Sequence, residues 1–297
     1  MRKKKMPAKE IVFQVCMIII FAMLFIACFY PFYYIFIVSI SDPQAAQATT
    51  ISFLPIKLTL ENYKKVFELN GIWRSFGVSV ARTVIGTIIT LFFTSILAYT
   101  LTKDELPGRK FFYRFAVISM YINAGLIPWY LTMRSLHLKD SFLVYIIPTA
   151  VSAYCLILIK TYMESISPAL EESARIDGAG YFSVYAKIIM PICLPILAAV
   201  IVFTAVMQWN MWTDNLLLVN SNNLKTLQMT LLEYLNQASN IANQAKSGGT
   251  AAVAGSAITP FTLRMTITMV VTLPILLVYP FMQKYFIQGI MVGAVKG

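Results

Sequence analysis

The sequence has few charged residues and almost no histidine. Asp, Glu, Lys and Arg together make up 12% of its 297 residues, hydrophobic residues make up 58%, and the mean hydropathy is +0.70. A soluble globular domain carries about 25% charged residues, so this composition excludes that class. It indicates a polytopic membrane protein.

The motifs of nucleotide hydrolysis, metal binding and nucleophilic catalysis are absent too. The sequence has no G-x-x-x-x-G-K-[ST] loop to cradle ATP phosphates, no nucleophile elbow, no zinc-ligand spacing and no paired-carboxylate arrangement of a hydrolase. Its single histidine, His137, lies in a short polar connection. The cysteines lie inside apolar runs without a C-x-x-C pair, which is typical of small buried side chains (Cys16, Cys28, Cys155 and Cys193). We therefore predict no catalytic residue, no metal site and no cofactor in this chain.

Apolar stretches recur along the chain at lengths that cross a bilayer, for which about 20 residues suffice. Basic residues precede the first stretch, which is longer than the core of a signal peptide, so we expect an uncleaved helix. The prediction is an all-α polytopic membrane protein with six transmembrane helices, a segment 1–10 before them, one transmembrane domain (11–286) and a tail (287–297). The expected spans are residues 11–40, 72–101, 111–133, 142–162, 188–207 and 261–286.

The distribution of basic residues predicts the orientation. The chain has 24 Lys and Arg against 13 Asp and Glu, but the excess does not form one long patch, so we expect no nucleic-acid partner. The inner segments of the six-span prediction hold 14 basic residues and the outer segments hold 7, as the positive-inside rule requires. Both termini and the connection between the fourth and fifth spans are therefore expected in the cytoplasm, and the polar segment 208–257 outside.

The connection between the fourth and fifth spans, residues 167–187, contains the most distinctive polar stretch. Ser167 is expected to cap a short helix whose first position is Pro168, where the missing N–H costs nothing. Gly178 and Gly180 are expected to end the helix, because glycine tolerates the positive φ of a reversal. A short helix with small side chains, a glycine break and a return to apolar sequence predict a docking element at a membrane surface.

The residues of this stretch resemble a known signature. Glu172-Ser173-Ala174, then Gly178, then Ile188-Ile189-Met190-Pro191 resemble the EAA–G–(nine residues)–I-x-L-P loop of ABC importer permeases, and residues 176–179 resemble the version in carbohydrate importers. In that family the loop forms a coupling helix that enters a cleft on a cytoplasmic ATPase. The resemblance implies that Glu172 is the charged contact, Ala174 the close-packing contact and Gly178 the turn. It assigns ATPase coupling to Glu171, Glu172, Ser173, Ala174, Asp177 and Gly178.

The resemblance also implies an assembly. It implies the type I permease fold and a location in a bacterial cytoplasmic membrane. The partners it implies are a second homologous permease, two ATPase subunits that hold ATP and Mg, and an extracytoplasmic solute-binding protein. The mechanism it implies is alternating access. Residues 123–130, 134–136 and 209–214 look like the branch that imports oligosaccharides and polysaccharide fragments, and residues 285–297 resemble an ending that reaches the ATPase dimer.

Polar and aromatic residues in the spans and at their outer ends are candidates for a sugar pathway. Polar groups within spans are costly unless they face protein or a water-filled cavity, and aromatic rings stack on pyranose faces. The same aromatic residues also anchor helices at the interface. Arg82 and Arg264 are expected to snorkel or to pair helices. The candidates for the pathway are Tyr121, Asn123, Trp129, Tyr154, Gln208, Trp209, Asn210, Trp212, Asp214 and Asn215.

Three other functions are consistent with a membrane protein of this length. An ABC permease for another solute, such as a peptide or polyamine, shares the docking loop. A secondary transporter has no ATPase partner. An enzyme acting on lipid-linked sugars needs a carboxylate or histidine constellation near the interface, which the sequence lacks.

Overall fold

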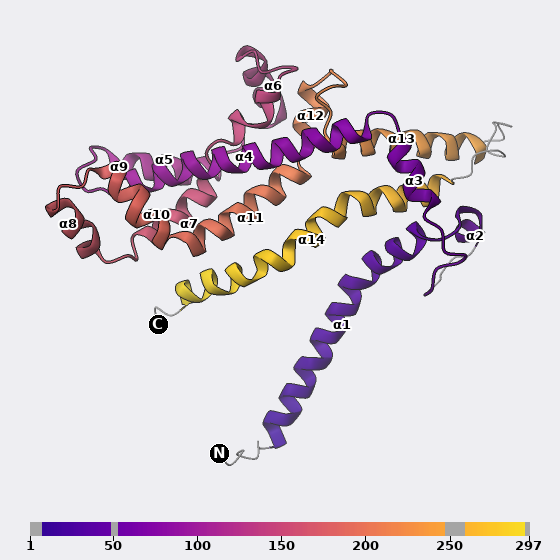
Figure 1. Ribbon diagram of the computed structural model, residues 1–297, viewed down its shortest axis with the longest axis horizontal. Coiled ribbons are helices and arrows are strands. Elements are labelled where there is room, and N and C mark those ends of the chain that lie inside the picture. Colours follow the sequence, from indigo (N-terminus) through magenta and orange to yellow (C-terminus); the bar gives the residue numbers. More distant parts are fainter. Residues whose placement is uncertain (1–7, 49–52, 247–258, 295–297) are drawn as a thin grey trace. The chain divides into compact units, whose positions relative to one another are not determined.

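The computed structural model describes residues 8–48, 53–246 and 259–294, which are helical with irregular connections and contain no strand (Figure 1). The chain divides into two compact units. One consists of Met1–Leu69 with Tyr234–Thr272, and the other of Asn70–Glu233 with Leu273–Gly297. The predicted all-α class is confirmed for the described part of the chain.

The first unit contains one long apolar helix and a short segment that packs against its end. Its elements are α1 (Ala8–Ser39), α2 (Pro43–Ala48), α3 (Glu61–Glu68) and parts of α13 (Leu227–Lys246) and α14 (Pro260–Ala294). The buried Asn62 side chain donates hydrogen bonds to the backbone carbonyls of Ser39 (3.0 Å) and Ser41 (2.8 Å). These bonds satisfy carbonyls left open at the end of α1 and hold α3 there.

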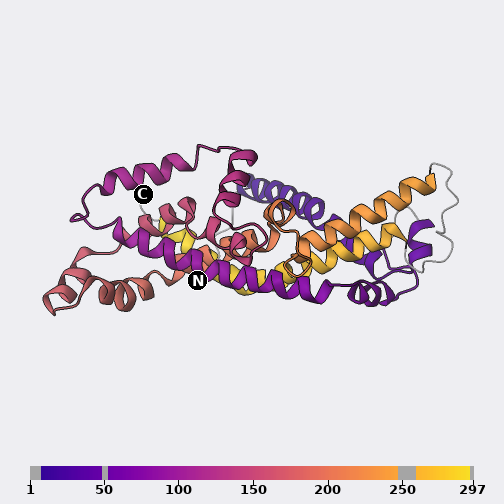
Figure 2. The ribbon, with the colours of Figure 1, turned by 90° about the horizontal axis from the view of Figure 1, so that it is seen from above.

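The second unit is organised around α4 (Ile72–Thr100), which packs against α7 (Ala153–Met163) and α11 (Leu194–Asn210). One apolar cluster joins these helices near the carboxyl end of α4, and a second joins α6 to α12. The remaining elements are α5 (Arg109–Ser119), α6 (Leu126–Ser135), η1 (Phe142–Tyr145), η2 (Ile147–Thr149), α8 (Pro168–Ile176), α9 (Tyr181–Val184), η3 (Tyr185–Ile189), α10 (Met190–Ile192) and α12 (Thr213–Leu218). Both views show α8 and α9 at the carboxyl end of α4 (Figures 1 and 2).

Three helices are long and apolar enough to cross a membrane: Lys9–Ser39, Ile72–Thr100 and Phe261–Val278. Two bent pairs of helices raise the count to five if each pair is one span. The first pair is Phe142–Thr149 with Ala153–Met163, bent by 45°, and the second is Tyr181–Ile192 with Leu194–Asn210, bent by 82°. The chain is therefore a membrane protein with three to five candidate spans in its described part.

The predicted third span, 111–133, is not one helix. It is divided between α5 and α6, and α5 has 11 residues, which reach only about 16 Å along a helix axis. The break has a local cause, because the Asn123 side chain accepts a hydrogen bond from the Gly125 backbone N–H at 2.9 Å. Gly125 has a φ of 85°, which glycine adopts without strain.

The predicted fifth span, 188–207, also differs from a straight helix. The chain makes a π-helical turn in η3 and bends sharply before α11 begins at Leu194. Pro191 and Pro195 lie on either side of the bend and lack the N–H that a continuous helix requires.

The segment predicted as an outer loop, 208–257, contains helical structure. Its first three residues complete α11, and α12 and the 20-residue α13 follow. The Ser/Gly/Ala stretch at 247–256 lies outside the described residues. At the other end of the chain, α14 continues to Ala294, so most of the predicted tail is helical, and residues 295–297 lie outside the described part.

Candidate functional site

The connection 167–187 begins with a helix, as the sequence predicts. α8 starts at Pro168, directly after Ser167, whose φ of −60° and ψ of 126° are the extended conformation of an N-cap. Ser167 thus occupies the predicted N-cap position, although its side chain forms no capping hydrogen bond.

The end of α8 is a Schellman motif. Gly178 has a φ of 85°, its N–H donates to the Arg175 carbonyl at 3.0 Å, and the Ala179 N–H donates to the Ala174 carbonyl at 2.9 Å. The prediction for Gly178 is therefore confirmed. Gly180 has a φ of −73° and needs no left-handed backbone, so the same prediction for Gly180 is wrong.

The two sides of α8 differ in what they contact. Ala174 is buried in the apolar cluster at the end of α4, so its close packing is made within this chain. Glu172, Ser173 and Asp177 are exposed to solvent. Ile176, which belongs to the 176–179 signature but not to the residues assigned to ATPase coupling, is 86% exposed. The sequence did contain a signal for this exposure, because Ile176 is a branched apolar residue between Arg175 and Asp177 in a polar helix.

Glu171 belongs to the inner side of α8. Its Oε1 accepts a hydrogen bond from the Tyr99 hydroxyl at 2.9 Å, and its Oε2 pairs with the Lys103 ammonium group. The Lys103 nitrogen lies 4.0 Å from the centre of the Tyr99 ring. Charged groups of α8 thus bind the carboxyl end of α4 and the connection that follows it.

A second link joins α8 and α9 to the same connection. Glu105 accepts hydrogen bonds from the Arg175 guanidinium at 3.0 Å and the Tyr181 hydroxyl at 3.3 Å. Its own backbone N–H and the Arg175 side chain lower the pKa of the Glu105 carboxyl. A polar cavity of about 400 Å³ lies between this connection, the end of α7 and α8.

A buried ion pair joins α4 to the segment after α11. Arg82 and Asp214 lie 2.5 Å apart, nitrogen to oxygen, and their side chains are 1% and 4% exposed. The Arg82 guanidinium also donates to the Met211 carbonyl at 2.8 Å and to the Gln208 side-chain oxygen at 3.1 Å. Arg82 is therefore a helix-pairing residue and does not snorkel.

Three of the predicted pathway residues belong to this buried network. The Gln208 amide donates to the Thr149 hydroxyl at 2.7 Å, and the Asn215 amide donates to the Tyr145 hydroxyl. Gln208, Asp214 and Asn215 are all buried, and they bind other parts of this chain. Gly86 lies close beside them: a Cβ there would lie 2.5 Å from the Gln208 side-chain nitrogen, so the Gln208 side chain would have to shift.

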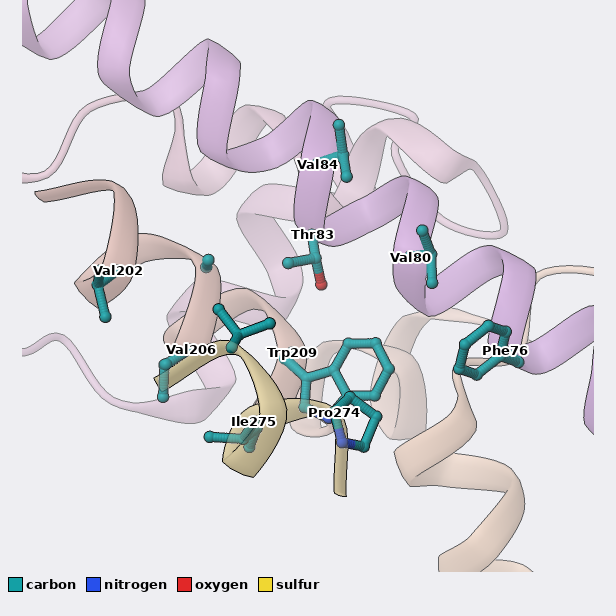
Figure 3. Close-up of a pocket in the computed structure, with 11 residues that line it drawn as sticks. Phe76, Val80, Thr83, Val84, Val202, Val206, Trp209, Pro274 and Ile275 are labelled. Atoms are coloured by element: carbon teal, nitrogen blue, oxygen red, sulfur yellow. The ribbon is translucent and has the colours of Figure 1, made fainter. Parts of the chain in front are cut away.

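Trp209 lines an apolar pocket. The pocket has a volume of about 260 Å³ and lies between α4, α11 and α14, with Pro274 and Ile275 in its wall (Figure 3). The ring of Phe76 packs edge-on against Trp209, with 6.2 Å between the ring centres. The Thr83 hydroxyl oxygen points into the space between the helices (Figure 3). Trp209 and the buried polar residues next to it in sequence thus have different surroundings.

The other predicted pathway residues lie in separate surroundings. Asn210 and Trp212 are exposed where α11 ends. Tyr121 and Asn123 lie in the break between α5 and α6, and both are exposed. Trp129 packs against the cluster of α6 and α12. The exposed Tyr154 packs edge-on against Phe203, with 6.2 Å between ring centres.

Comparisons with known proteins extend the local observations to the whole chain. No protein-family model matches the sequence. The chain is 34% identical over 270 residues to the polygalacturonan/rhamnogalacturonan transport system permease protein YtcP of Bacillus subtilis (strain 168), covering 91% of this chain and 93% of that protein. It is 35% identical over 287 residues to Protein LplC of the same organism, covering 96% and 95%.

A solved structure agrees with these relatives. One chain of a bacterial ABC transporter involved in the import of the acidic polysaccharide alginate superposes with a TM-score of 0.84 and 28% sequence identity, over 96% of this chain and all of that one. The likeness runs nearly end to end in sequence and in structure. This chain therefore belongs to the permease subunits of carbohydrate ABC importers.

Proposed function

We propose that this permease imports oligosaccharides or polysaccharide fragments that a solute-binding protein delivers from outside the cell. The observation that carries the proposal is the 34% identity over 91% of the chain to a permease whose name gives polygalacturonan and rhamnogalacturonan as its cargo. The likeness to a chain of an alginate importer supports the same class, because both cargoes are polymers with acidic sugars. The transport subunit itself performs no hydrolysis, and the ATPase is a separate subunit.

The assembly we propose has a second homologous permease, two cytoplasmic ATPases and the binding protein. The apolar surface of α5 supports the second permease, because this helix has no buried residue and exposes Phe111, Phe112 and Phe115. Phenylalanines exposed on a span face either lipid or another helix. ATP and Mg belong to the ATPases in this assembly.

The outer side of α8 is the surface that we propose enters the ATPase. Glu172, Ser173 and Asp177 are exposed there together with Ile176. An apolar side chain exposed at the end of a charged helix is typical of an anchor that fills a pocket on a partner. In this proposal Glu172 supplies the charged contact and Ile176 the apolar one, while Gly178 turns the chain back to the membrane.

The topology we propose has six crossings with both termini in the cytoplasm. The third crossing consists of α5, the break at 120–125 and α6. Irregular backbone at membrane depth is tolerated only where it lines a water-filled cavity or is buried in protein. Tyr121 and Asn123 in this break are therefore our candidates for a sugar pathway, with Tyr154 beside α11. An impermeant thiol reagent tests the sides, since Asn223→Cys should label from outside intact cells and Asp104→Cys should not, in a chain without native cysteines.

At the outer end we propose a division of roles between buried and exposed residues. Gln208, Asp214 and Asn215 hold the segment after α11 in place, while the exposed Asn210 and Trp212 meet the arriving sugar. Arg82 is neutralised by Asp214, so it is not available to bind a sugar carboxylate. Trp212→Ala and Asn210→Ala test this by the sugar-stimulated ATPase rate at equal amounts of assembled complex.

The proposed mechanism is alternating access driven by closure of the ATPases. Purification of the affinity-tagged chain from its own cells tests the assembly, and glycan analysis of the proposed binding protein tests the cargo. We expect an ATPase and a second permease to co-purify, and oligomers containing uronic acids on the binding protein. A chain that purifies without any ATPase would support a secondary transporter, and a binding protein that carries a peptide or polyamine would contradict the sugar assignment.

A further inference from the structure

We propose that Glu171 is a positioning residue that couples α8 to α4 and so carries the movement of the docking helix into the second span. The proposal rests on the proposed docking of α8 on an ATPase. It concerns the inner side of α8, which contacts this chain and not the partner. Glu171 would therefore act through α4, while Glu172, its neighbour in sequence, would act on the ATPase.

The contacts of Glu171 fix it in one place. One carboxylate oxygen accepts the Tyr99 hydroxyl at 2.9 Å, and the other pairs with Lys103. The Lys103 ammonium group lies over the Tyr99 ring, 4.0 Å from its centre. Each of the three side chains thus contacts the other two, which restricts all of them more than a single pair does.

Burial distinguishes this link from the other ion pairs of the region. The Glu171 and Lys103 side chains are 18% and 15% exposed, whereas those of Arg175 and Glu105 are 44% and 58% exposed. Exposed pairs are screened by water and salt and hold their partners weakly. Tyr99 is itself buried in the apolar cluster that contains Ala174 of α8. The firm connection between α8 and α4 is therefore the one through Glu171.

The middle of the same helix is held by another buried ion pair. Tyr99 lies 17 residues after Arg82 in α4, which corresponds to roughly 25 Å of helix. Arg82 is bound to Asp214 in the segment that follows α11. A shift of α8 is thus delivered through one continuous helix to the segment where we propose the sugar enters. Without the Glu171 link, α8 can move on the ATPase while α4 stays behind.

The experiment compares Glu171→Ala with the matched control Glu164→Gln in the complete complex in proteoliposomes with binding protein. Glu164 also pairs with a lysine, Lys160, but its side chain is 48% exposed and the pair lies four residues apart on the chain. We expect Glu171→Ala to keep the ATPase bound and hydrolysing ATP, and to transport at least tenfold less sugar per ATP. The control should keep the wild-type ratio. A wild-type ratio in Glu171→Ala would overturn the proposal.

A cross-link provides a second, independent test if that variant fails to assemble. Cysteines at positions 103 and 171, joined by a short bifunctional thiol reagent in a chain without native cysteines, replace the ion pair by a covalent link. Because the two elements are proposed to move together, we expect the cross-linked complex to transport within twofold of the cysteine-free complex that keeps Lys103 and Glu171. A cross-link that blocks transport shows that α8 slides on α4 and contradicts the proposal. Failure of the docking assignment is distinct, since then no ATPase binds even the wild-type chain.

Discussion

Arg82 and Asp214 form a buried ion pair across 132 positions of sequence, with 2.5 Å between nitrogen and oxygen. Truncating one partner of such a pair leaves the other charge buried and uncompensated, which typically costs about 3–5 kcal/mol. We therefore expect Asp214→Ala to lower the thermal midpoint of the purified protein strongly and to reduce the amount in the membrane.

A matched control comes from Lys225 and Glu233, whose side chains are 22% and 35% exposed. Glu233→Ala should cost less than about 1 kcal/mol, because exposed pairs are weak. Thermal midpoints measured by size-exclusion chromatography in detergent compare the two variants. If Asp214→Ala were as mild as Glu233→Ala, the pair would not hold α4 to the segment after α11.

Substituting alanine for either of two glycines of α4 should change the stability of the protein in opposite directions. A Cβ at Gly86 would lie 2.5 Å from the Gln208 side-chain nitrogen, whereas a Cβ at Gly77 meets no atom within 4 Å. Gly86→Ala should displace Gln208 from Arg82 and cost about 1–3 kcal/mol. Gly77→Ala should gain up to about 1 kcal/mol of helix stability. Equal effects of both variants on the thermal midpoint would show that the close approach at Gly86 is not required.

The turn after α8 provides a second glycine pair. Gly178 has a φ of 85° and Gly180 one of −73°, and a Cβ at either position would meet no atom within 4 Å. An L-residue in the left-handed region costs about 1–2 kcal/mol, so Gly178→Ala should weaken the turn while Gly180→Ala should not. Uptake per amount of complex measures the difference, and a larger loss from Gly180→Ala would contradict the assignment of the turn.

Ile176 should contribute to the affinity for the ATPase. Burying an isoleucine side chain is worth about 1.5–3 kcal/mol, so Ile176→Ala should weaken ATPase binding by roughly 10-fold or more. Ile176→Leu keeps the apolar area and is the matched control. Binding of purified ATPase to the permease pair in nanodiscs measures both, and unchanged binding of Ile176→Ala would remove the proposed anchor.

Much of the helical framework was predictable because its signals are local. The span expected at 72–101 is α4 at Ile72–Thr100. The helix α8 begins at Pro168 and the chain turns at Gly178, as the proline and the glycine predict. The break in the third span was also encoded locally, by Asn123 and Gly125. The prediction missed this break because the apolar residues on both sides of it indicated one continuous span.

The direction in which the outer polar residues point was not encoded locally. Gln208, Trp209 and Asp214 lie close together in sequence. The Trp209 indole nevertheless lines an apolar pocket, whereas the side chains of Gln208 and Asp214 bind Arg82. The signal that was available is Arg82, an arginine in the middle of an apolar span, which favours a carboxylate partner. Choosing Asp214 as that partner needs the fold.

The central claim is that sugar import by this chain is driven through α8 by a separate ATPase. Its most direct test is uptake of labelled oligogalacturonides into proteoliposomes that contain both permeases, the ATPases and the loaded binding protein. We predict uptake that requires ATP, falls at least tenfold in Glu172→Lys with the ATPase still hydrolysing ATP, and is unchanged in Glu164→Gln. Uptake that persists without the ATPases, or that is normal in Glu172→Lys, would contradict the account.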